Sequence, residues 1–384
     1  MIPRTVARFA KQKWSAACGN ALILRRSHAR ARHSLVDMRS DTLTKPSKEM
    51  LSTALTAPLG DDVFSEDPTV NKLQDKTADL FNKEAALWLP SGTMANLVAV
   101  MAHCHERASE MIVGKESHLT LWEGGNISTI AGVNPRQVLE NNVGKMDLED
   151  VKDVWRLDND DHFAKTALVC IENSHNMMGG SALDKEYIYE LGSLAKELNI
   201  KVHIDGARIF NAAVSLQTPV SDLCESADSV SICLSKGLGA PMGSMLVGSK
   251  EFIRLARRAR KRIGGGTRQA GVVAAMGMYA IENNVDRLAE DHERAKRIAI
   301  ALKDNGFYQP QDGHVDTNIV YFGLPTDCKL SKEEFTRVLK DEYGVLVGYG
   351  YSRGGELFRA CTHIDVDGKD VDHAIESILA VQAR

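Results

Sequence analysis

The sequence predicts an α/β fold with a mostly parallel central sheet, helices on both faces of that sheet, and a small C-terminal α/β domain. Short apolar runs alternate along the chain with longer segments of helical periodicity, which favours βα units joined by right-handed crossovers. The runs are apolar throughout, as expected for strands that are covered on both faces. The 384 residues are enough for two domains.

The first 36 residues differ from the rest of the chain. They contain eight of the 47 Lys and Arg residues and no Asp or Glu. A basic, acid-free segment with apolar residues near helical spacing is typical of a mitochondrial presequence. A disordered basic tail on a cytosolic protein is the alternative, whereas the apolar run at 21–24 is too short for a secretory signal. We therefore expect residues 1–36 to be a leader and the protein to act in the mitochondrial matrix.

The remaining chain is expected to divide into an N-terminal arm with the large domain, residues 37–285, and a small domain, residues 286–384. Apolar runs predict strands of the large domain at 86–89, 110–113, 166–171, 201–204, 229–234 and 244–247. Helical periodicity predicts helices at 47–57, 69–82, 93–106, 184–198 and 250–262. We expect a long helix at 268–303 to lead into the small domain, with strands at 318–322 and 345–347 and helices at 332–343 and 370–383.

Composition and charge exclude several classes of protein. The formal net charge of -4 gives no basis for non-specific nucleic-acid binding. The seven cysteines are scattered and lack a C-x-x-C pair, so we expect neither a disulfide framework nor a metal site. The longest apolar stretch, residues 270–281, has 12 residues, whereas a membrane span needs about 20. We therefore expect an enzyme without a nucleic-acid or membrane partner.

Polar side chains follow three successive predicted strands of the large domain. His175 follows the first, Asp205 and Arg208 follow the second, and Lys236 follows the third. Because ligands of open parallel sheets bind at the carboxyl ends of the strands, these side chains are expected to share one crevice. A lysine that can form a Schiff base, together with an aspartate that keeps a pyridine nitrogen protonated, suits pyridoxal 5'-phosphate (PLP).

A phosphate site is predicted at residues 90–96, PSGTMAN, which follow one strand and open a helix. Helix N-termini offer unpaired N–H groups and partial positive charge, Gly92 allows close approach, and Thr93 adds a hydroxyl. The pattern also fits an ordinary capped helix. With Asp205 and Lys236 downstream, it predicts a site for the PLP phosphate.

The chain resembles the low-specificity L-threonine aldolases, which belong to the fold-type-I, aspartate aminotransferase-like superfamily of PLP-dependent enzymes. The resemblance runs from about residue 37 to the end and rests on several short motifs. These are MRSDT at 38–42, GDDV at 60–63, DPTVN at 67–71, SGT at 91–93, ENSHN at 172–176, HIDGARIF at 203–210, SKGLG at 235–239, GGGTRQ at 264–269 and RACTH at 359–363.

The resemblance implies roles for residues around the cofactor. Lys236 is the Schiff-base lysine, Asp205 pairs with the pyridine nitrogen, and His118 stacks on the ring. Gly92 and Thr93 bind the phosphate, helped by Arg268 from a neighbouring subunit. Ser40, Arg208 and Arg359 hold the substrate carboxylate, with Arg208 also bordering the cofactor, and His175 faces the substrate hydroxyl. Whether His118, His175 or a held water is the base stays open.

The implied reaction is retro-aldol cleavage of L-threonine or L-allo-threonine to glycine and acetaldehyde, through an external aldimine and a ring-stabilised (quinonoid) carbanion. The resemblance also implies a homo-oligomer, in particular a homotetramer. The alternatives are another fold-type-I lyase, either β-eliminating or serine hydroxymethyltransferase-like, and a PLP-binding protein without turnover. Two departures from the family pattern bear on substrate preference: Phe64 stands where tyrosine is usual and Thr267 where methionine is common.

Overall fold

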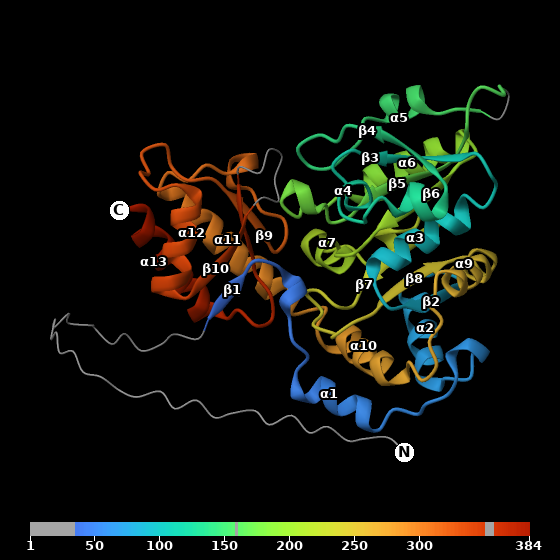
Figure 1. Cartoon of the computed structure of the whole chain (residues 1–384), viewed down its shortest axis with the longest axis horizontal. Helices are drawn as coiled ribbons and strands as arrows, with labels where there is room; N and C mark the ends of the chain where they lie inside the picture. The colour runs from blue at the N-terminus through green and yellow to red at the C-terminus, as the bar shows by residue number, and fades with distance from the viewer. Residues whose placement is uncertain (1–34, 158–159, 350–356) are drawn as a thin grey trace, which may run out of the picture. The chain divides into compact units, whose positions relative to one another are not determined.

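The computed structural model describes residues 35–157, 160–349 and 357–384 (Figure 1). The predicted leader therefore lies outside the described residues, apart from its last two positions. In this part of the chain, two sheets form within one compact unit. None of the helices described has both the length and the apolar character that crossing a membrane requires.

The larger sheet has seven strands in the order β2-β8-β7-β6-β5-β3-β4. Every neighbouring pair is parallel except the two that involve β8. The predicted mostly parallel α/β sheet is therefore confirmed. The strands are β2 (Ala85–Leu89), β3 (Ser109–Gly114), β4 (Asn134–Val138), β5 (Lys165–Glu172), β6 (Lys201–Asp205), β7 (Ser229–Cys233) and β8 (Ser244–Gly248).

Helices cover both faces of this sheet, and side chains alternate between the two covers. Trp88 of β2 packs in one core cluster, whereas its neighbours Leu87 and Leu89 pack in another. The Trp88 side is covered by α2 (Pro68–Leu80), α6 (Lys185–Glu197), α7 (Ile209–Leu216), α8 (Val220–Leu223) and α10 (Gly271–Asn283). The opposite side is covered by α3 (Gly92–His103) and α9 (Lys250–Arg262).

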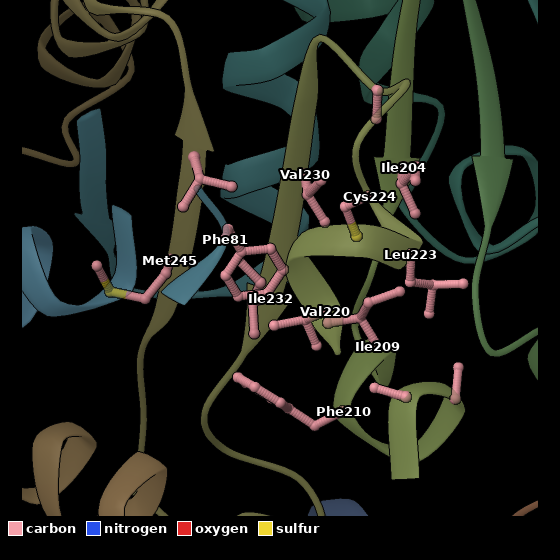
Figure 2. Close-up of a cluster of buried hydrophobic side chains, with 14 of the residues drawn as sticks. Phe81, Ile204, Ile209, Phe210, Val220, Leu223, Cys224, Val230, Ile232 and Met245 are labelled. Carbon is pink, nitrogen blue, oxygen red and sulfur yellow. The ribbon is translucent and has the colours of Figure 1, made fainter. Parts of the chain in front are cut away.

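Figure 2 shows the core on the Trp88 side, where α7 and α8 meet β6 and β7. Phe81 and Phe210 meet edge to face with ring centroids 5.8 Å apart. Ile232 of β7 and Val220 are buried beside them. Burying each such side chain contributes roughly 1.5–3 kcal/mol, so this cluster holds α7 and α8 firmly on the sheet.

Side-chain caps explain where the main helices begin. Asp67 accepts hydrogen bonds from Thr69 N and Val70 N, and Pro68 follows it in the first turn of α2. The remaining α-helices are α1 (Lys48–Leu55), α4 (His118–Leu121), α5 (Leu148–Val154), α11 (Leu288–Asp304), α12 (Lys332–Tyr343) and α13 (Gly368–Gln382).

The prediction of one long helix at 268–303 is wrong. The chain forms α10 and α11 instead, with a break after Asn283. The Asn284 side chain turns away to donate to the carbonyl of Leu238 at 2.8 Å. Asn and Asp residues compete for main-chain hydrogen bonds and so favour helix ends, which explains the break in this Asn- and Asp-containing segment. The expected domain boundary at residue 285 falls in this turn.

The smaller sheet has the order β1-β10-β11-β9. Its strands are β1 (Val36–Met38), β9 (Ile319–Phe322), β10 (Val345–Tyr349) and β11 (Phe358–Cys361). The edge strand β1 is parallel to β10 and pairs Met38 with Val347. The N-terminal arm is therefore anchored in the small sheet before it continues to Ser40 and Asp41.

Candidate active site

The carboxyl ends of β5 and β6 are in register, and β7 continues two residues beyond them. Glu172 pairs with Asp205, and Asp205 pairs with Ser231. Lys236 lies in the turn after β7, where its carbonyl accepts from Thr44 Oγ1 at 2.9 Å. The structure thus gathers at one sheet edge the strand ends that the sequence singled out.

Asp205 is a buried hydrogen-bond acceptor with 2% of its surface exposed. Oδ1 accepts from Ala207 N at 3.1 Å, and Oδ2 accepts from Asn96 Nδ2 at 2.9 Å. Each carboxylate oxygen has two acceptor positions, so Asp205 can still accept the N–H of a protonated ring.

His118 opens α4 next to this carboxylate. Its N–H donates to Glu172 Oε2 at 2.7 Å, and its Nδ1 lies 3.0 Å from Glu123 Oε1. Burial lowers the pKa of His118, but the hydrogen bond to Glu123 and the charge of Asp205 outweigh it, so that pKa is raised; the charge of Lys236 opposes them. Because Nδ1 binds Glu123, proton exchange with a ligand would use Nε2.

Hydrogen-bond donors fill the space between the carboxylates of this cluster. His118, Glu123 and Asp205 each offer one atom that can ligate a metal ion, and these three atoms lie within 4.8 Å of one another. However, the amide nitrogen of Asn96 donates to Glu123 Oε1 at 2.8 Å and to Asp205 Oδ2 at 2.9 Å. An amide N–H₂ in that position satisfies the carboxylates as a bound cation would. The cluster therefore fits an organic cofactor with an N–H group better than it fits a metal ion.

The N-terminus of α3 forms the candidate phosphate cradle. Ser91 caps the helix by accepting from Met94 N at 3.2 Å, and the Thr93 side chain is exposed. A Cβ at Gly92 would come within 2.6 Å of Cys233 Sγ. Glycine thus lets the helix N-terminus approach the end of β7, three residues before Lys236.

Arg208 is held in a buried ion pair with Asp41. Its Nε and Nη2 each lie 2.7 Å from an oxygen of Asp41, in the two-pronged geometry of an arginine–carboxylate pair. Burial raises the pKa of Asp41. The charge and hydrogen bonds of Arg208 and the charges of Lys236 and Arg359 lower it by more, so the pKa of Asp41 is strongly lowered overall. The role of Arg208 in holding a substrate carboxylate stays a prediction, because a carboxylate of the chain already binds two of its donors.

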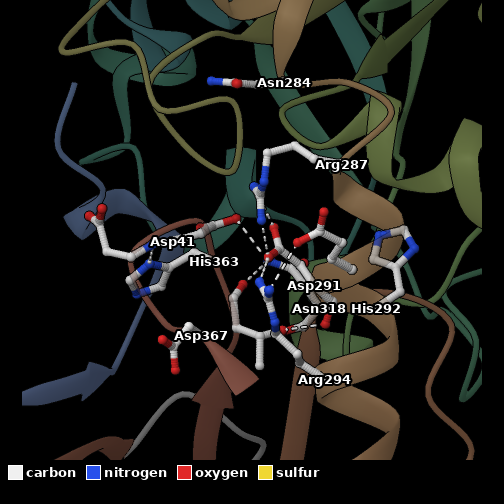
Figure 3. A network of polar contacts seen from close by, with 12 residues as sticks. Asp41, Asn284, Arg287, Asp291, His292, Arg294, Asn318, His363 and Asp367 are labelled. Atoms are coloured by element: carbon white, nitrogen blue, oxygen red, sulfur yellow. Dashed lines mark hydrogen bonds and ion pairs between the residues drawn. The ribbon is translucent and has the colours of Figure 1, made fainter. Parts of the chain in front are cut away.

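A polar network connects Asp41 to the small sheet and to α11 (Figure 3). Asn318 Nδ2 donates to Asp41 Oδ2 at 3.3 Å and to Thr362 O at 3.0 Å. Thr362 Oγ1 donates to the carbonyl of Asp291, whose carboxylate binds Arg287 at 2.5 Å. The network therefore fixes the arm at the point where it enters the site.

Arg359 lies in β11 and points toward the same arm. Its Nη2 donates to Arg39 O at 2.8 Å, and its Nη1 donates to Asn176 Oδ1 at 3.0 Å. Ser40 caps the short helix that follows, accepting from Thr42 N at 3.2 Å. Arg359 thus contacts the arm at the residue before Ser40, and the roles of both residues toward a substrate carboxylate stay predictions.

Two predicted site residues, His175 and Arg268, have side-chain contacts with residues outside the cluster around Asp205. The His175 side chain is 1% exposed, its Nε2 lies 3.3 Å from Glu140 Oε1, and its Nδ1 is buried without a hydrogen bond to any described residue. Burial lowers the pKa of His175, but the charge of Glu172 and the contact with Glu140 raise it overall. Arg268 is 57% exposed and binds Asp61 at 2.7 Å. Their roles toward the substrate hydroxyl and a neighbour's phosphate stay predictions.

Sequence reasoning assigned no role to several residues that shape this site. Asp41 lies within the MRSDT motif and Asn96 ends the PSGTMAN segment, but nothing in either motif shows a partner more than a hundred residues away. Glu123 follows His118 by five residues, and that proximity is a signal that could have been used.

Comparisons with known proteins give a consistent result. Residues 37–324 match the model of the beta-eliminating lyase family. The chain is similar to low-specificity L-threonine aldolase 1 of Arabidopsis thaliana, with 41% identity over 341 residues, 88% of this chain and 94% of the relative. It is also similar to the low specificity L-threonine aldolase of Escherichia coli K12, with 41% identity over 333 residues, 86% and 95% of the two chains.

A solved structure supports the fold. The structure of Leishmania major threonine aldolase superposes with a TM-score of 0.77, covering 90% of this chain and 99% of that one. The two sequences are 18% identical, so this likeness concerns the fold alone.

Proposed function

The chain belongs to the beta-eliminating lyase family and, within it, to the low-specificity L-threonine aldolases, and from this membership we propose that it cleaves L-threonine and L-allo-threonine to glycine and acetaldehyde. The observation that carries the proposal is the buried acceptor Asp205, at the same sheet edge as Lys236 and His118. A β-hydroxy-α-amino acid is the class of substrate that such a site would cleave between Cα and Cβ.

The functional groups that line the site fit PLP. Lys236 supplies the amine, Asp205 the acceptor for a ring N–H, and the α3 N-terminus at Gly92 the phosphate cradle. When bound, PLP supplies an electron sink for the electrons of the broken Cα–Cβ bond. We propose that the half-buried His118 stacks on the ring, and its hydrogen bond from Nδ1 to Glu123 would hold it there.

We propose that Arg359 binds the substrate carboxylate, together with Ser40 of the N-terminal arm. A charge-assisted hydrogen bond contributes about 1.5–3 kcal/mol, so Arg359→Ala should raise KM for L-threonine by about ten- to a hundredfold. Arg359→Lys should recover part of the loss, because a point charge lacks the planar fork. Steady-state kinetics on holoenzyme would check this. Unchanged KM in Arg359→Ala, or loss of PLP instead of substrate affinity, would contradict the assignment.

The base that takes the hydroxyl proton can be identified by the pH dependence of kcat/KM. A base works only when unprotonated, so activity falls as pH drops through its pKa. Glu123 raises the pKa of His118, and Glu140 raises that of His175. If His118 is the base, Glu123→Gln should move the acid limb to lower pH while Glu140→Gln leaves it in place.

These two variants are matched because each replaces a buried carboxylate by an amide of the same shape. Asn126 Oδ1 has no hydrogen bond to any described residue. If the Asn126 amide flips, this oxygen can accept the new N–H at position 123. A limb that moves only in Glu140→Gln would assign the base to His175. A limb that moves in neither variant would assign it to a held water.

The proposed function is tested by the products. Purified holoenzyme with L-threonine and with L-allo-threonine should release acetaldehyde and glycine in equal amounts. Pyruvate and ammonia would indicate a β-eliminating lyase, and dependence on a folate would indicate a serine hydroxymethyltransferase-like enzyme. Bound PLP without any product would overturn the enzymatic proposal.

We also propose that the active protein is a homo-oligomer, in particular a tetramer. Support comes from the exposed Arg268 and from large apolar side chains exposed between β1 and α2, such as Leu55 at 86% and Phe64 at 69%. Sedimentation at assay concentration is the test, and a fully active monomer would refute the proposal.

For residues 1–36, the basic leader supports import into the mitochondrial matrix. Fractionation of cells, with sequencing of the mature N-terminus, tests this proposal. An uncleaved protein confined to the cytosol would contradict it.

A further inference from the structure

A stripe of buried polar side chains lies on the α3-facing side of β6 and β7. His203, Asp205, Ser229 and Ser231 are each exposed by 2% or less, whereas Ile204 between the first two faces the apolar core on the other side. Central strands of a parallel sheet are normally apolar on both faces. Buried polar groups are costly unless hydrogen-bonded, so the side chains of this stripe are expected to have hydrogen-bond partners.

Asn96 of α3 connects the stripe to the active site. Its Oδ1 lies 2.7 Å from Ser231 Oγ and 3.2 Å from His203 Nε2. Its Nδ2 lies 2.9 Å from Asp205 Oδ2 and 2.8 Å from Glu123 Oε1. With 2% of its surface exposed, Asn96 makes four hydrogen bonds and uses both ends of its amide.

The chemistry of these partners fixes the orientation of the amide. Carboxylate oxygens accept hydrogen bonds, so the N–H₂ group must face Asp205 and Glu123. Oδ1 is then the acceptor, and His203 Nε2 must carry a proton to donate to it. Burial lowers the pKa of His203 to about 4, so this ring is neutral near pH 7 and its Nδ1 is an acceptor.

The chain of donors continues beyond His203. Ser229 Oγ lies 2.8 Å from His203 Nδ1 and 2.7 Å from His103 Nε2. Ser229 has one proton, which must go to His203 Nδ1, so His103 Nε2 donates to Ser229. Burial also holds the pKa of His103 well below its ordinary value, which keeps this ring neutral. Every hydrogen bond from His103 to Asp205 therefore points the same way, toward the carboxylate.

We propose that Asn96, backed by this donor chain, is a positioning residue that keeps the proton of the Asp205–pyridine pair on the ring nitrogen. A hydrogen-bond donor favours the charged form of the carboxylate that accepts from it, and Asn96 Nδ2 donates to Asp205 Oδ2 at 2.9 Å. Without the Asn96 N–H, the proton would move from the ring nitrogen to an Asp205 oxygen, with no other change in atoms. The inference rests on the proposed function, because it presupposes PLP at this site.

The test compares Asn96→Ala with Asn126→Ala. Asn126 also donates to Glu123, at 3.3 Å, but no hydrogen bond joins its side chain to Asp205 in the described structure, so this variant is a matched control. Holoenzyme reconstituted with PLP carrying ¹⁵N in the ring is examined by NMR, because the ¹⁵N shift distinguishes protonated from neutral pyridine. We expect the protonated shift in wild type and Asn126→Ala, and a displacement toward the neutral shift in Asn96→Ala.

Kinetics provide a second readout. A hydrogen bond to a charged group corresponds to about a ten- to hundredfold effect, so kcat of Asn96→Ala should fall by that factor with KM for L-threonine little changed. Ser231→Ala removes one donor to Asn96 Oδ1 and should shift the NMR signal in the same direction by less. This milder variant keeps the inference testable if Asn96→Ala does not fold.

The outcomes separate the inference from the proposed function. If wild-type protein binds PLP and cleaves threonine while Asn96→Ala and Ser231→Ala both retain the wild-type ¹⁵N shift, the inference alone is overturned. If Asn126→Ala changes the shift as much as Asn96→Ala, the effect comes through Glu123 and the inference is again overturned. If wild-type protein binds no PLP, the proposed function fails and the inference fails with it.

Discussion

Replacing Lys236 by alanine is expected to abolish cleavage of L-threonine and the covalent attachment of PLP. In the proposed function the lysine amine would bond to the cofactor aldehyde, and a methyl group cannot form that bond. Asp205 and the α3 N-terminus remain in place in the variant, so some PLP should still bind without a covalent link. Borohydride reduction followed by mass spectrometry should label Lys236 in wild type and leave the variant unlabelled.

A suitable control for this variant is Lys201→Ala. Lys201 begins β6 at the opposite end of the strand from Asp205 and pairs on the surface with Asp228 at 2.8 Å. Such exposed pairs contribute about 0–1 kcal/mol to stability, so this variant should retain both activity and PLP. Wild-type turnover in Lys236→Ala would show that the central assignment is wrong.

Sequence patterns predicted the parts of the fold in which burial is continuous along the chain. The strands β2, β3 and β5 to β8 are apolar runs and were found from that pattern alone. β4 was missed because its burial is partial and it contains Pro135, so no apolar run marks it. β1 has three residues and is paired with β10, which lies about three hundred positions later, and local patterning carries no information about such pairing.

For the candidate site, the sequence predicted side chains that stand at strand ends and missed those that depend on a distant partner. Asp205 and Lys236 follow apolar runs, and sheet topology then places them at one edge. The Arg208–Asp41 ion pair joins residues 167 positions apart, and Asn96 contacts Asp205 across 109 positions. On a helix an asparagine without a visible partner indicates a surface position, so its burial could be learned from the tertiary structure alone.

The second large effect is expected for Asp205→Asn, which should fold and bind PLP but lose most of its activity. An ionised carboxylate favours the protonated pyridine ring by charge attraction, and an amide does not. The amide also fits its surroundings poorly. In the wild-type structure both Asp205 oxygens accept hydrogen bonds, one from Ala207 N and one from Asn96 Nδ2. An N–H₂ group at either position would face another donor, so one of these hydrogen bonds would be lost.

The rate effect follows from the charge that develops during cleavage. A bound PLP would stabilise the electrons of the broken Cα–Cβ bond to the extent that its ring nitrogen is positively charged, so kcat of Asp205→Asn should fall on the order of a hundredfold or more. Asp228→Asn, at the opposite end of the sheet, provides a control with the same chemical change and should retain kcat. Steady-state kinetics and the ¹⁵N shift of the ring should change together in Asp205→Asn. Near-normal kcat with a neutral ring would mean that this enzyme does not need the protonated pyridine, and Asp205 would then serve to position the cofactor.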